Sequence, residues 1–517
     1  MVKALKAVFA AIMTLSTATL VLTPPIAAAQ AAKITWEDCP ESIVRPGAQC
    51  GRIDVPKDYR NPEAEKISVG FVQFKAKRAT KDTVFVNPGG PGVSAYQMLA
   101  DPESFPLPDG FFADYDVVGV QPRGLVGSTP LDCTESQSQN PIDGLFQAGK
   151  AMRDACAQAQ PGLVDALTTE NTARDWEEVR KALQKDRISI LGLSYGTILG
   201  STYATLFPNQ TNRVVLDSGL DAETLWSDIM SKQEAGYRNA MHDFFSWAAK
   251  NDDKYHLGKT PYAVYTRWAE RVRSESGTWP PLTPPKATAA DVPIPGSGEP
   301  GAEVMNSVEP GRVQAQNLGE QLLTNSSVSN SLLYILSYNM VPMPFQWEKL
   351  AEMTSNPAIE REILANYQQE ENAIEQARIS TMMQQALICN ESTTPPNRAD
   401  FTRYLWNSLV TRDPFIMGAV TVGSGAICEG SPAITRVPQF NGSALKVRPL
   451  QLQATGDPQT PYGNFWNMQK QMNTHLITIH GPGHGHFGLG DEKVDKLVLD
   501  YFAGTNPTVT ELPGYFG

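Results

Sequence analysis

The sequence is poor in basic residues and in motifs that bind metals. It has 43 lysine and arginine residues against 55 aspartate and glutamate residues, for a formal net charge of −12. Nucleic acids and anionic membrane surfaces are bound through basic patches, so neither is an expected partner. The chain contains no Cys-x-x-Cys and no His-Glu-x-x-His spacing. We therefore expect neither a metal site nor another cofactor.

Long apolar runs are lacking too, apart from one at the N-terminus. Lys3 and Lys6 precede an apolar run over residues 7–22, which leads to small residues at 27–31. This order is typical of a signal peptide, residues 1–31, that is removed on export. A permanent anchor is the weaker interpretation, because the run contains hydroxyl residues and two prolines follow it. We expect a secreted or cell-envelope protein whose mature chain has no transmembrane segment.

Cysteines are few, and their number is even. The chain has 6 of them, in three sequential pairs. An even count in an exported protein indicates disulfides. Six cysteines allow fifteen pairings, so a choice that favours short loops is a prediction and not a deduction. We predict the pairs Cys39–Cys50, Cys133–Cys156 and Cys389–Cys428.

Strand-like and helix-like segments alternate over the first third of the chain and return near its end. Short apolar or alternating runs predict strands, and apolar residues at helical spacing predict helices. Their order, strand and helix in turn, is typical of an α/β protein with a mostly parallel sheet flanked by helices. Strands are expected at 67–75, 83–86, 115–120, 187–191, 214–216, 450–454 and 476–479, and helices at 94–99, 173–183, 197–207 and 491–502.

Residues 220–387 follow a different pattern. They are helical in periodicity, rich in tryptophan, tyrosine, phenylalanine and methionine, and contain no convincing strand. We expect them to form a helical cap inserted into the core, whose two parts are then residues 32–219 and 388–517. Within the cap, residues 277–301 are crowded with proline and glycine. This stretch is expected to be a surface loop.

Ser194 is the candidate nucleophile. It is the centre of a Gly-x-Ser-x-Gly motif at residues 192–196, between an expected strand and an expected helix. In such a turn the glycines relieve crowding and leave the serine hydroxyl exposed at the sheet edge. The alternative is an ordinary glycine-rich turn, since the motif arises by chance in about one chain in six of this length. The flanking helix, strand and helix favour the nucleophile.

A serine nucleophile needs a base and a carboxylate that orients the base, in the chain order serine, acid, histidine. His484 lies in a glycine-rich loop after the last expected strand, and Asp457 follows the strand before it. His486 competes with His484, and Asp217, one strand after the nucleophile, competes with Asp457. A plain surface loop and a plain turn are the simpler interpretations of these two segments. The other histidines are interpreted as structural: His242, His256, His475 and His480.

Backbone donors must also hold the oxyanion of the reacting carbonyl. We expect the amides of Tyr195, next to the nucleophile, and of Gly90, in the early glycine run, to do so. Pro91 has no amide proton, which narrows the choice. A phosphate cradle is the alternative for this run, but it lacks the Gly-Lys-Ser/Thr ending. Thr460 is expected to hydrogen-bond the carboxylate of Asp457.

Five ordered motifs together resemble a known family. The chain resembles the secreted tripeptidyl aminopeptidases, relatives of proline iminopeptidase that include cell-envelope serine proteases and carboxylesterases. The likeness runs from about residue 35 to the C-terminus and is weakest in the cap. Two departures are Val93, which interrupts a glycine-rich stretch, and Gln121, which replaces an acid. The motifs are Asn87-Pro88-Gly89-Gly90-Pro91-Gly92, Gly124-x-x-Gly127-Ser128, Gly192-Leu193-Ser194-Tyr195-Gly196-Thr197, Asp457-Pro458-Gln459-Thr460-Pro461 and Gly483-His484-Gly485.

The resemblance implies the α/β-hydrolase fold, a helical lid over the site and removal of short peptides from a free N-terminus. Recognition of an ammonium group requires a carboxylate. Glu391 is the candidate, because it resembles the acid after the family's cysteine; a solvated loop acid is the alternative. We expect a secreted serine exopeptidase that acts on peptide or protein N-termini and releases short peptides, in particular tripeptides. A carboxylesterase or lipase acting on envelope lipids, and a binding protein on an inactive scaffold, are the alternatives.

Overall fold

The computed structural model describes residues 31–100, 102, 105–133, 141–294, 296–360, 362 and 373–517. The expected signal peptide, residues 1–31, lies outside the described residues except for Ala31. Residues from Ala32 to Gly517 form one compact unit. Within the described ranges, no helix is long and apolar enough to cross a membrane.

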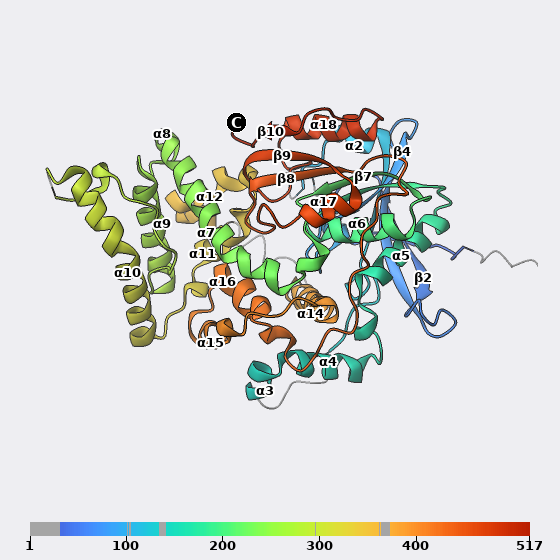
Figure 1. Cartoon of the computed structure of the whole chain (residues 1–517), viewed down its shortest axis with the longest axis horizontal. Helices are drawn as coiled ribbons and strands as arrows, with labels where there is room; N and C mark the ends of the chain where they lie inside the picture. The colour runs from blue at the N-terminus through green and yellow to red at the C-terminus, as the bar shows by residue number, and fades with distance from the viewer. Residues whose placement is uncertain are drawn as a thin grey trace, which may run out of the picture. The chain divides into compact units, whose positions relative to one another are not determined.

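A ten-stranded mixed sheet forms the centre of this unit (Figure 1), in the order β1-β2-β3-β5-β4-β6-β7-β8-β9-β10. Strands β1, β2 and β3 pair antiparallel, as do β3 and β5, and every later pair is parallel. The parallel part is therefore flanked by an antiparallel N-terminal edge. The strands are β1 Thr35–Glu37, β2 Ala48–Pro56, β3 Lys66–Phe74, β4 Asp82–Asn87, β5 Tyr115–Val120, β6 Ile188–Leu193, β7 Thr211–Asp217, β8 Leu450–Gly456, β9 His475–Pro482 and β10 Glu511–Pro513.

The expected fold class is confirmed, and each strand expected from the sequence is present. Strands β1, β2 and β10 were not expected. In β2, Gly51 and Arg52 interrupt the alternation of apolar side chains, and two neighbouring strands determine its conformation. The short edge strands have only three residues each, too few for a periodic signal.

Helices cover both faces of the sheet. One apolar cluster packs α5, α6 and α17 against one face, with Trp176 and Tyr203 among its buried side chains. A second cluster packs α1, α2 and α18 against the other face, with Phe111 and Tyr501 buried. These helices are α1 Ala95–Ala100, α2 Asp109–Asp114, α5 Thr169–Ala182, α6 Tyr195–Leu206, α17 Trp466–Met472 and α18 Glu492–Phe502.

A long helical insertion separates β7 from β8, and its described residues contain no strand. It has an apolar core of its own, in which Phe244, Trp268, Tyr334 and Trp347 are buried. In Figure 1 its helices α8, α9 and α10 lie away from the strands. The helices are α7 Ser227–Lys250, α8 Asp252–Tyr255, α9 Pro261–Ser276, α10 Gly298–Thr324, α11 Leu332–Met340, α12 Trp347–Ser355, α14 Ala373–Glu391, α15 Phe401–Trp406 and α16 Pro414–Gly418.

Two details of the insertion differ from a simple sequence interpretation. The stretch 277–301 was expected to be a loop. Its described residues before α10 are irregular, apart from a short 3-10 turn, but α10 begins at Gly298. Pro300 is compatible with the first turn of a helix, because the amide it lacks would have no partner there. Residues 388–449, expected to belong to the second part of the core, contain α15 and α16 and reach no strand before Leu450.

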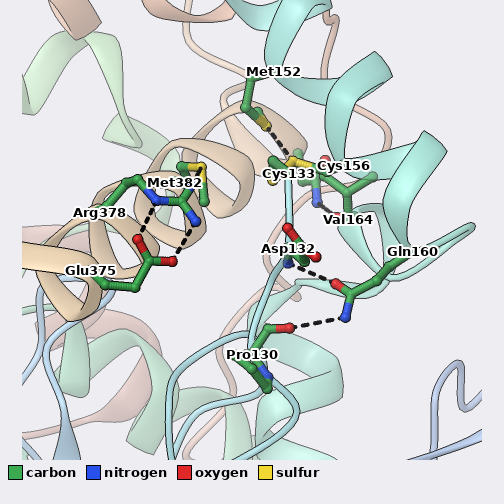
Figure 2. The surroundings of a disulfide bond; sticks show 11 residues. Pro130, Asp132, Cys133, Met152, Cys156, Gln160, Val164, Glu375, Arg378 and Met382 are labelled. Atoms are coloured by element: carbon green, nitrogen blue, oxygen red, sulfur yellow. Dashed lines mark hydrogen bonds and ion pairs between the residues drawn. A yellow bond between two sulfur atoms is a disulfide. The ribbon is translucent and has the colours of Figure 1, made fainter. Parts of the chain in front are cut away.

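The three predicted disulfides are confirmed. Cys39 pairs with Cys50, Cys133 with Cys156, and Cys389 with Cys428. Figure 2 shows the second of them, at the start of the segment that leads to α3 (Pro141–Phe146) and α4 (Ala148–Ala159). Beside it the side chain of Gln160 accepts the amide of Asp132 at 2.8 Å and donates to the carbonyl of Pro130 at 3.1 Å. Residues 130–133 are thus attached to α4 by the disulfide, and to Gln160, directly after α4, by hydrogen bonds.

Candidate active site

Ser194 lies in a tight turn between β6 and α6. Its φ of 57° and ψ of −125° fall in a region that residues other than glycine seldom adopt. A Cβ on Gly192 would lie 2.2 Å from the carbonyl oxygen of Gly196, and one on Gly196 would lie 2.5 Å from the carbonyl oxygen of Asn87. Both glycines of the motif are therefore required by close backbone approaches. Such strain at a turn between a strand and a helix is typical of a nucleophilic serine.

The early glycine run packs directly on this turn. A Cβ on Gly89 would lie 2.8 Å from Cβ of Ser194 and 3.1 Å from the amide nitrogen of Tyr195. The side-chain oxygen of Asn87 accepts the amide of Gly89 at 2.9 Å and fixes the start of the run. Gly90 follows directly, with a φ of 104°. Tyr195 is the first residue of α6, where amides have no partner within the helix.

Asp457 and His484 form a buried pair at the ends of β8 and β9. Nδ1 of His484 lies 3.0 Å from both carboxylate oxygens of Asp457. The carboxylate also accepts the amides of Gln459 and Thr460, each at 2.8 Å, and the hydroxyl of Thr460 at 2.7 Å. Burial by itself raises the pKa of Asp457, but His484 and the hydrogen bonds from residue 460 outweigh it and hold this pKa below its usual value. The acid is therefore ionised and aimed at the imidazole.

The histidine loop lies against the nucleophile turn. A Cβ on Gly485 would lie 2.8 Å from the side chain of Leu193, the residue before Ser194. Ser218 binds both the histidine loop and the loop of Asp457. Its hydroxyl accepts the amide of Gly485 at 2.8 Å, and its carbonyl accepts the hydroxyl of Thr460 at 3.2 Å. Residues far apart in the sequence thus meet at one edge of the sheet.

The side chain of Asp217, the alternative acid, binds backbone amides of the same loop. Its Oδ2 accepts the amides of His486 and Phe487 at 2.8 and 2.9 Å. Burial raises the pKa of Asp217 and lowers that of His486. Among the described residues, Oδ1 of Asp217 and Nε2 of His486 have no hydrogen-bond partner. The geometry therefore favours Asp457 over Asp217, and His484 over His486, as the acid and base.

Residues of the insertion contact each of these loops. The carbonyl of Pro342 accepts the amide of His484 at 2.7 Å. The hydroxyl of Ser380 donates to the carbonyl of Gly92 at 2.6 Å, and the hydroxyl of Tyr237 accepts the side-chain amide of Gln459 at 2.7 Å. The insertion is thus attached directly to the candidate site.

Glu391 lies at the end of α14, where it binds the first residue of α5. Its carboxylate accepts the amide and the hydroxyl of Thr169, each at 2.7 Å. The Thr169 hydroxyl also lies 2.9 Å from the hydroxyl of Tyr195, next to the nucleophile. Glu391 is only 2% exposed, yet it contributes to the wall of a cavity of about 180 Å³ that Asp165 and Glu170 also line. Its two hydrogen bonds connect the insertion to α5, and the hydroxyl of Thr169 continues the network to Tyr195 at the start of α6.

Burial of Glu391 raises the pKa of this carboxyl to about 7, from an ordinary value of 4.5. Because the folded protein holds this proton more tightly than the unfolded chain, the contribution to stability is complete below pH 4.5 and is lost as the pH rises through 7. Between pH 4 and pH 8 we expect the wild type to lose about 3 kcal/mol of unfolding free energy relative to Glu391→Gln. Urea denaturation of both proteins, with the disulfides intact, measures this difference.

The control is Glu170→Gln, which removes a carboxylate at the same end of α5 from a side chain that is 42% exposed. Between pH 4 and pH 8, its unfolding free energy should change with pH as that of the wild type does. If Glu391→Gln also followed the wild type at every pH, the carboxyl of Glu391 would not hold its proton as the buried site implies.

Several supporting residues escape a reading of the sequence. Thr169 and Ser218 act through hydrogen bonds to segments distant along the chain, and serine and threonine are too common in loops to signal this. Two of the histidines interpreted as structural bond to backbone carbonyls: His242 to Thr283 and His475 to Val509. Elsewhere in the described chain, no group of three or more histidine, cysteine or acidic residues is arranged to hold a metal ion.

Comparison with known proteins agrees with this geometry. A family model described as the alpha/beta hydrolase fold matches residues 82–359, more than half of the chain. The chain belongs to the α/β-hydrolase family. A model described as TAP-like protein matches residues 413–511, which include the Asp457 and His484 loops. The family expected from the sequence is confirmed, and the protein is a serine hydrolase by class.

Three proteins similar to this α/β-hydrolase carry the names of two peptidases and an esterase. The tripeptidyl aminopeptidase of Streptomyces coelicolor is 33% identical over 270 residues, 47% of this chain; the match spans about half (49%) of that relative's length. The serine protease Hip1 of Mycobacterium tuberculosis is 24% identical over 505 residues, 92% of this chain and 89% of the relative. Carboxylesterase B of the same organism is 25% identical over 501 residues, 92% of this chain and 88% of the relative.

Proposed function

We propose that this protein is a serine exopeptidase that removes short peptides, of three residues, from free N-termini. The observation that carries the proposal is the buried Asp457–His484 pair, in a loop that packs on the strained turn of Ser194. A positioned carboxylate, imidazole and serine in this chain order are the parts that acyl transfer requires. Peptidases among the relatives, 33% and 24% identical, support a peptide substrate.

In the proposed reaction His484 takes the proton of the Ser194 hydroxyl as the oxygen attacks the scissile carbonyl. Asp457 holds the imidazole in the correct tautomer and stabilises its charged form. The protonated imidazole then donates its proton to the leaving amine as the carbon–nitrogen bond breaks, which leaves an acyl group on Ser194. His484 next takes a proton from water as the water oxygen attacks the acyl carbon. The protonated imidazole returns a proton to the Ser194 oxygen as the bond between that oxygen and the acyl carbon breaks, which releases the short peptide.

Backbone amides of Tyr195 and Gly90 are the proposed donors to the oxyanion. An amide at the first position of a helix has no partner within that helix, and the positive end of the helix dipole adds to its effect. The network from Glu391 through Thr169 to the hydroxyl of Tyr195 supports this donor from below. Fixed donors of this kind stabilise the developing negative charge without reorganisation.

We further propose that residues 220–387 act as a cap over the site and that they determine the choice of substrate. The support is the set of contacts from Tyr237, Pro342 and Ser380 to the catalytic loops. Recognition of the substrate ammonium by Glu391 stays a prediction, since Thr169 already occupies both of its oxygens. Export to the cell envelope or the medium is part of the proposal and is supported by the three disulfides.

A comparison of three substrates tests this function. A tripeptide amide with a free N-terminus should be cleaved about 10-fold to 100-fold faster than its N-acetylated form, because a hydrogen bond to a charged group contributes about 1.5–3 kcal/mol. A long-chain ester is the third substrate. Chromatography measures the amine released from each peptide and the acid released from the ester. Equal rates for the two peptides would defeat N-terminal recognition.

A carboxylesterase is the second candidate. It is favoured by the relative named Carboxylesterase B, which is 25% identical over most of both chains. The steps up to the acyl-enzyme are shared, so only the substrate differs. If kcat/KM for the ester exceeded that for the free peptide, the esterase would be the better assignment.

A further inference from the structure

A second cavity, of about 700 Å³, lies beside the catalytic loops and outside the proposed triad. It is bounded by α7 and α12 of the insertion, by backbone at the ends of β8 and β9, and by the C-terminal segment. Figure 1 draws α7, α12, β8 and β9 around the C-terminus. Of the described residues that line it, none belongs to the triad. The lining side chains include Asp243, Trp247, Lys250, Trp347 and Phe516.

One wall of this cavity is aromatic. The ring centroids of Trp247 and Trp347 are 5.9 Å apart, and Phe516 lies 5.5 Å from the first and 5.1 Å from the second. Trp347 is 1% exposed, and its indole nitrogen donates to the carbonyl of Val341 at 3.0 Å. The wall is thus an extended and fixed apolar surface, which suits side chains of a small ligand.

Two opposite charges stand at the ends of that wall. Asp243 and Lys250 are seven residues apart on α7, two helical turns, so their Cα atoms are about 10.5 Å apart along the axis. Neither side chain forms an ion pair or a hydrogen bond with any residue that the structure describes. Burial by neighbouring groups raises the pKa of Asp243, although this side chain still opens to solvent. Both charges are free to bind a ligand.

We propose that this cavity binds a short peptide with free ends, its ammonium group at Asp243 and its carboxylate at Lys250. An extended chain advances about 3.3–3.6 Å per residue, so three residues span the distance between the two charges. The side chains of the peptide then lie against Trp247 and Phe516. The identity of the ligand as a reaction product rests on the proposed function; the binding chemistry does not.

The test uses the full chain with Ser194→Ala, so that the peptide is not turned over. Binding of trialanine, N-acetyl-trialanine and trialanine amide is measured by titration calorimetry and by tryptophan fluorescence. We expect each blocked peptide to bind at least 10-fold more weakly than trialanine. Asp243→Asn and Lys250→Met should each weaken the binding of trialanine by a similar factor. Asp253→Asn, an equal charge change on exposed α8, is the control and should bind as before.

Binding that survives both Asp243→Asn and Lys250→Met, or equal binding of the blocked peptides, would overturn the proposal, as would absence of binding. Hydrolysis is measured separately, with Ser194 intact. Trialanine binding without any peptide hydrolysis would reject the proposed function and leave this site in place. Hydrolysis that persists in the two cavity variants, with binding lost, would show that the site is separate from catalysis.

Discussion

Ser194→Ala will lower kcat/KM by a factor of about 10⁴–10⁶ and will abolish formation of an acyl-enzyme. A methyl group cannot attack a carbonyl, and loss of the nucleophile in a serine triad removes nearly all of the catalysis that the triad supplies. The residual rate comes from substrate binding and the oxyanion donors. Steady-state kinetics and covalent labelling by a fluorophosphonate probe measure the two effects.

Ser355→Ala is the matched control for this experiment. Its hydroxyl donates only to the carbonyl of Glu352 at the end of α12, far along the chain from the candidate site. Kinetics and labelling should equal those of the wild type. Labelling retained by Ser194→Ala would reject Ser194 as the nucleophile.

Asp457→Asn will lower kcat by about 10⁴-fold, while Asp217→Asn will lower it by less than 10-fold. An amide in place of Asp457 cannot hold the imidazole of His484 in the tautomer that accepts the serine proton, nor stabilise its charged form. Asp217 accepts two backbone amides through one oxygen, and an amide oxygen can do the same. Initial rates at saturating substrate for the two variants, side by side, measure this contrast.

The comparison isolates the charge and the hydrogen bonds of each acid, because aspartate and asparagine have nearly the same size and shape. A larger loss of kcat in Asp217→Asn than in Asp457→Asn would exchange the roles of the two acids.

Local chemistry is enough to choose the residues proposed as nucleophile, acid and base. Each lies directly after a strand, in a loop whose residue types announce a tight turn, and their order along the chain is that of one fold. The hydrogen bond from Thr460 to Asp457 could be predicted for the same reason, because the two residues are three positions apart. Strands β4 to β9 were predictable because they contain short apolar runs, and β4, β5 and β6 are buried almost throughout.

Long-range contacts set the limit of prediction. The partner of Glu391 is Thr169, 222 residues earlier, and the partner of Ser218 is Gly485, 267 residues later. No periodicity or motif connects such positions. Strand β2 was missed for a similar reason, since its neighbours β1 and β3, and not its own residues, make it extended. The cavity next to Asp243 depends on the C-terminal Phe516 and could not be foreseen from α7 alone.

The position of the helical insertion has a consequence for how relatives of this protein diverge. The proposed nucleophile precedes it and the proposed acid and base follow it, so no triad residue lies inside it. The part of the insertion around α9, α11 and α12 has its own apolar core, so it can accumulate substitutions without disturbing the sheet. Evolution can therefore change which molecules are cleaved while it conserves the chemistry of cleavage. An exchange of insertions between a peptidase and an esterase of this family would be the laboratory equivalent of that modular history.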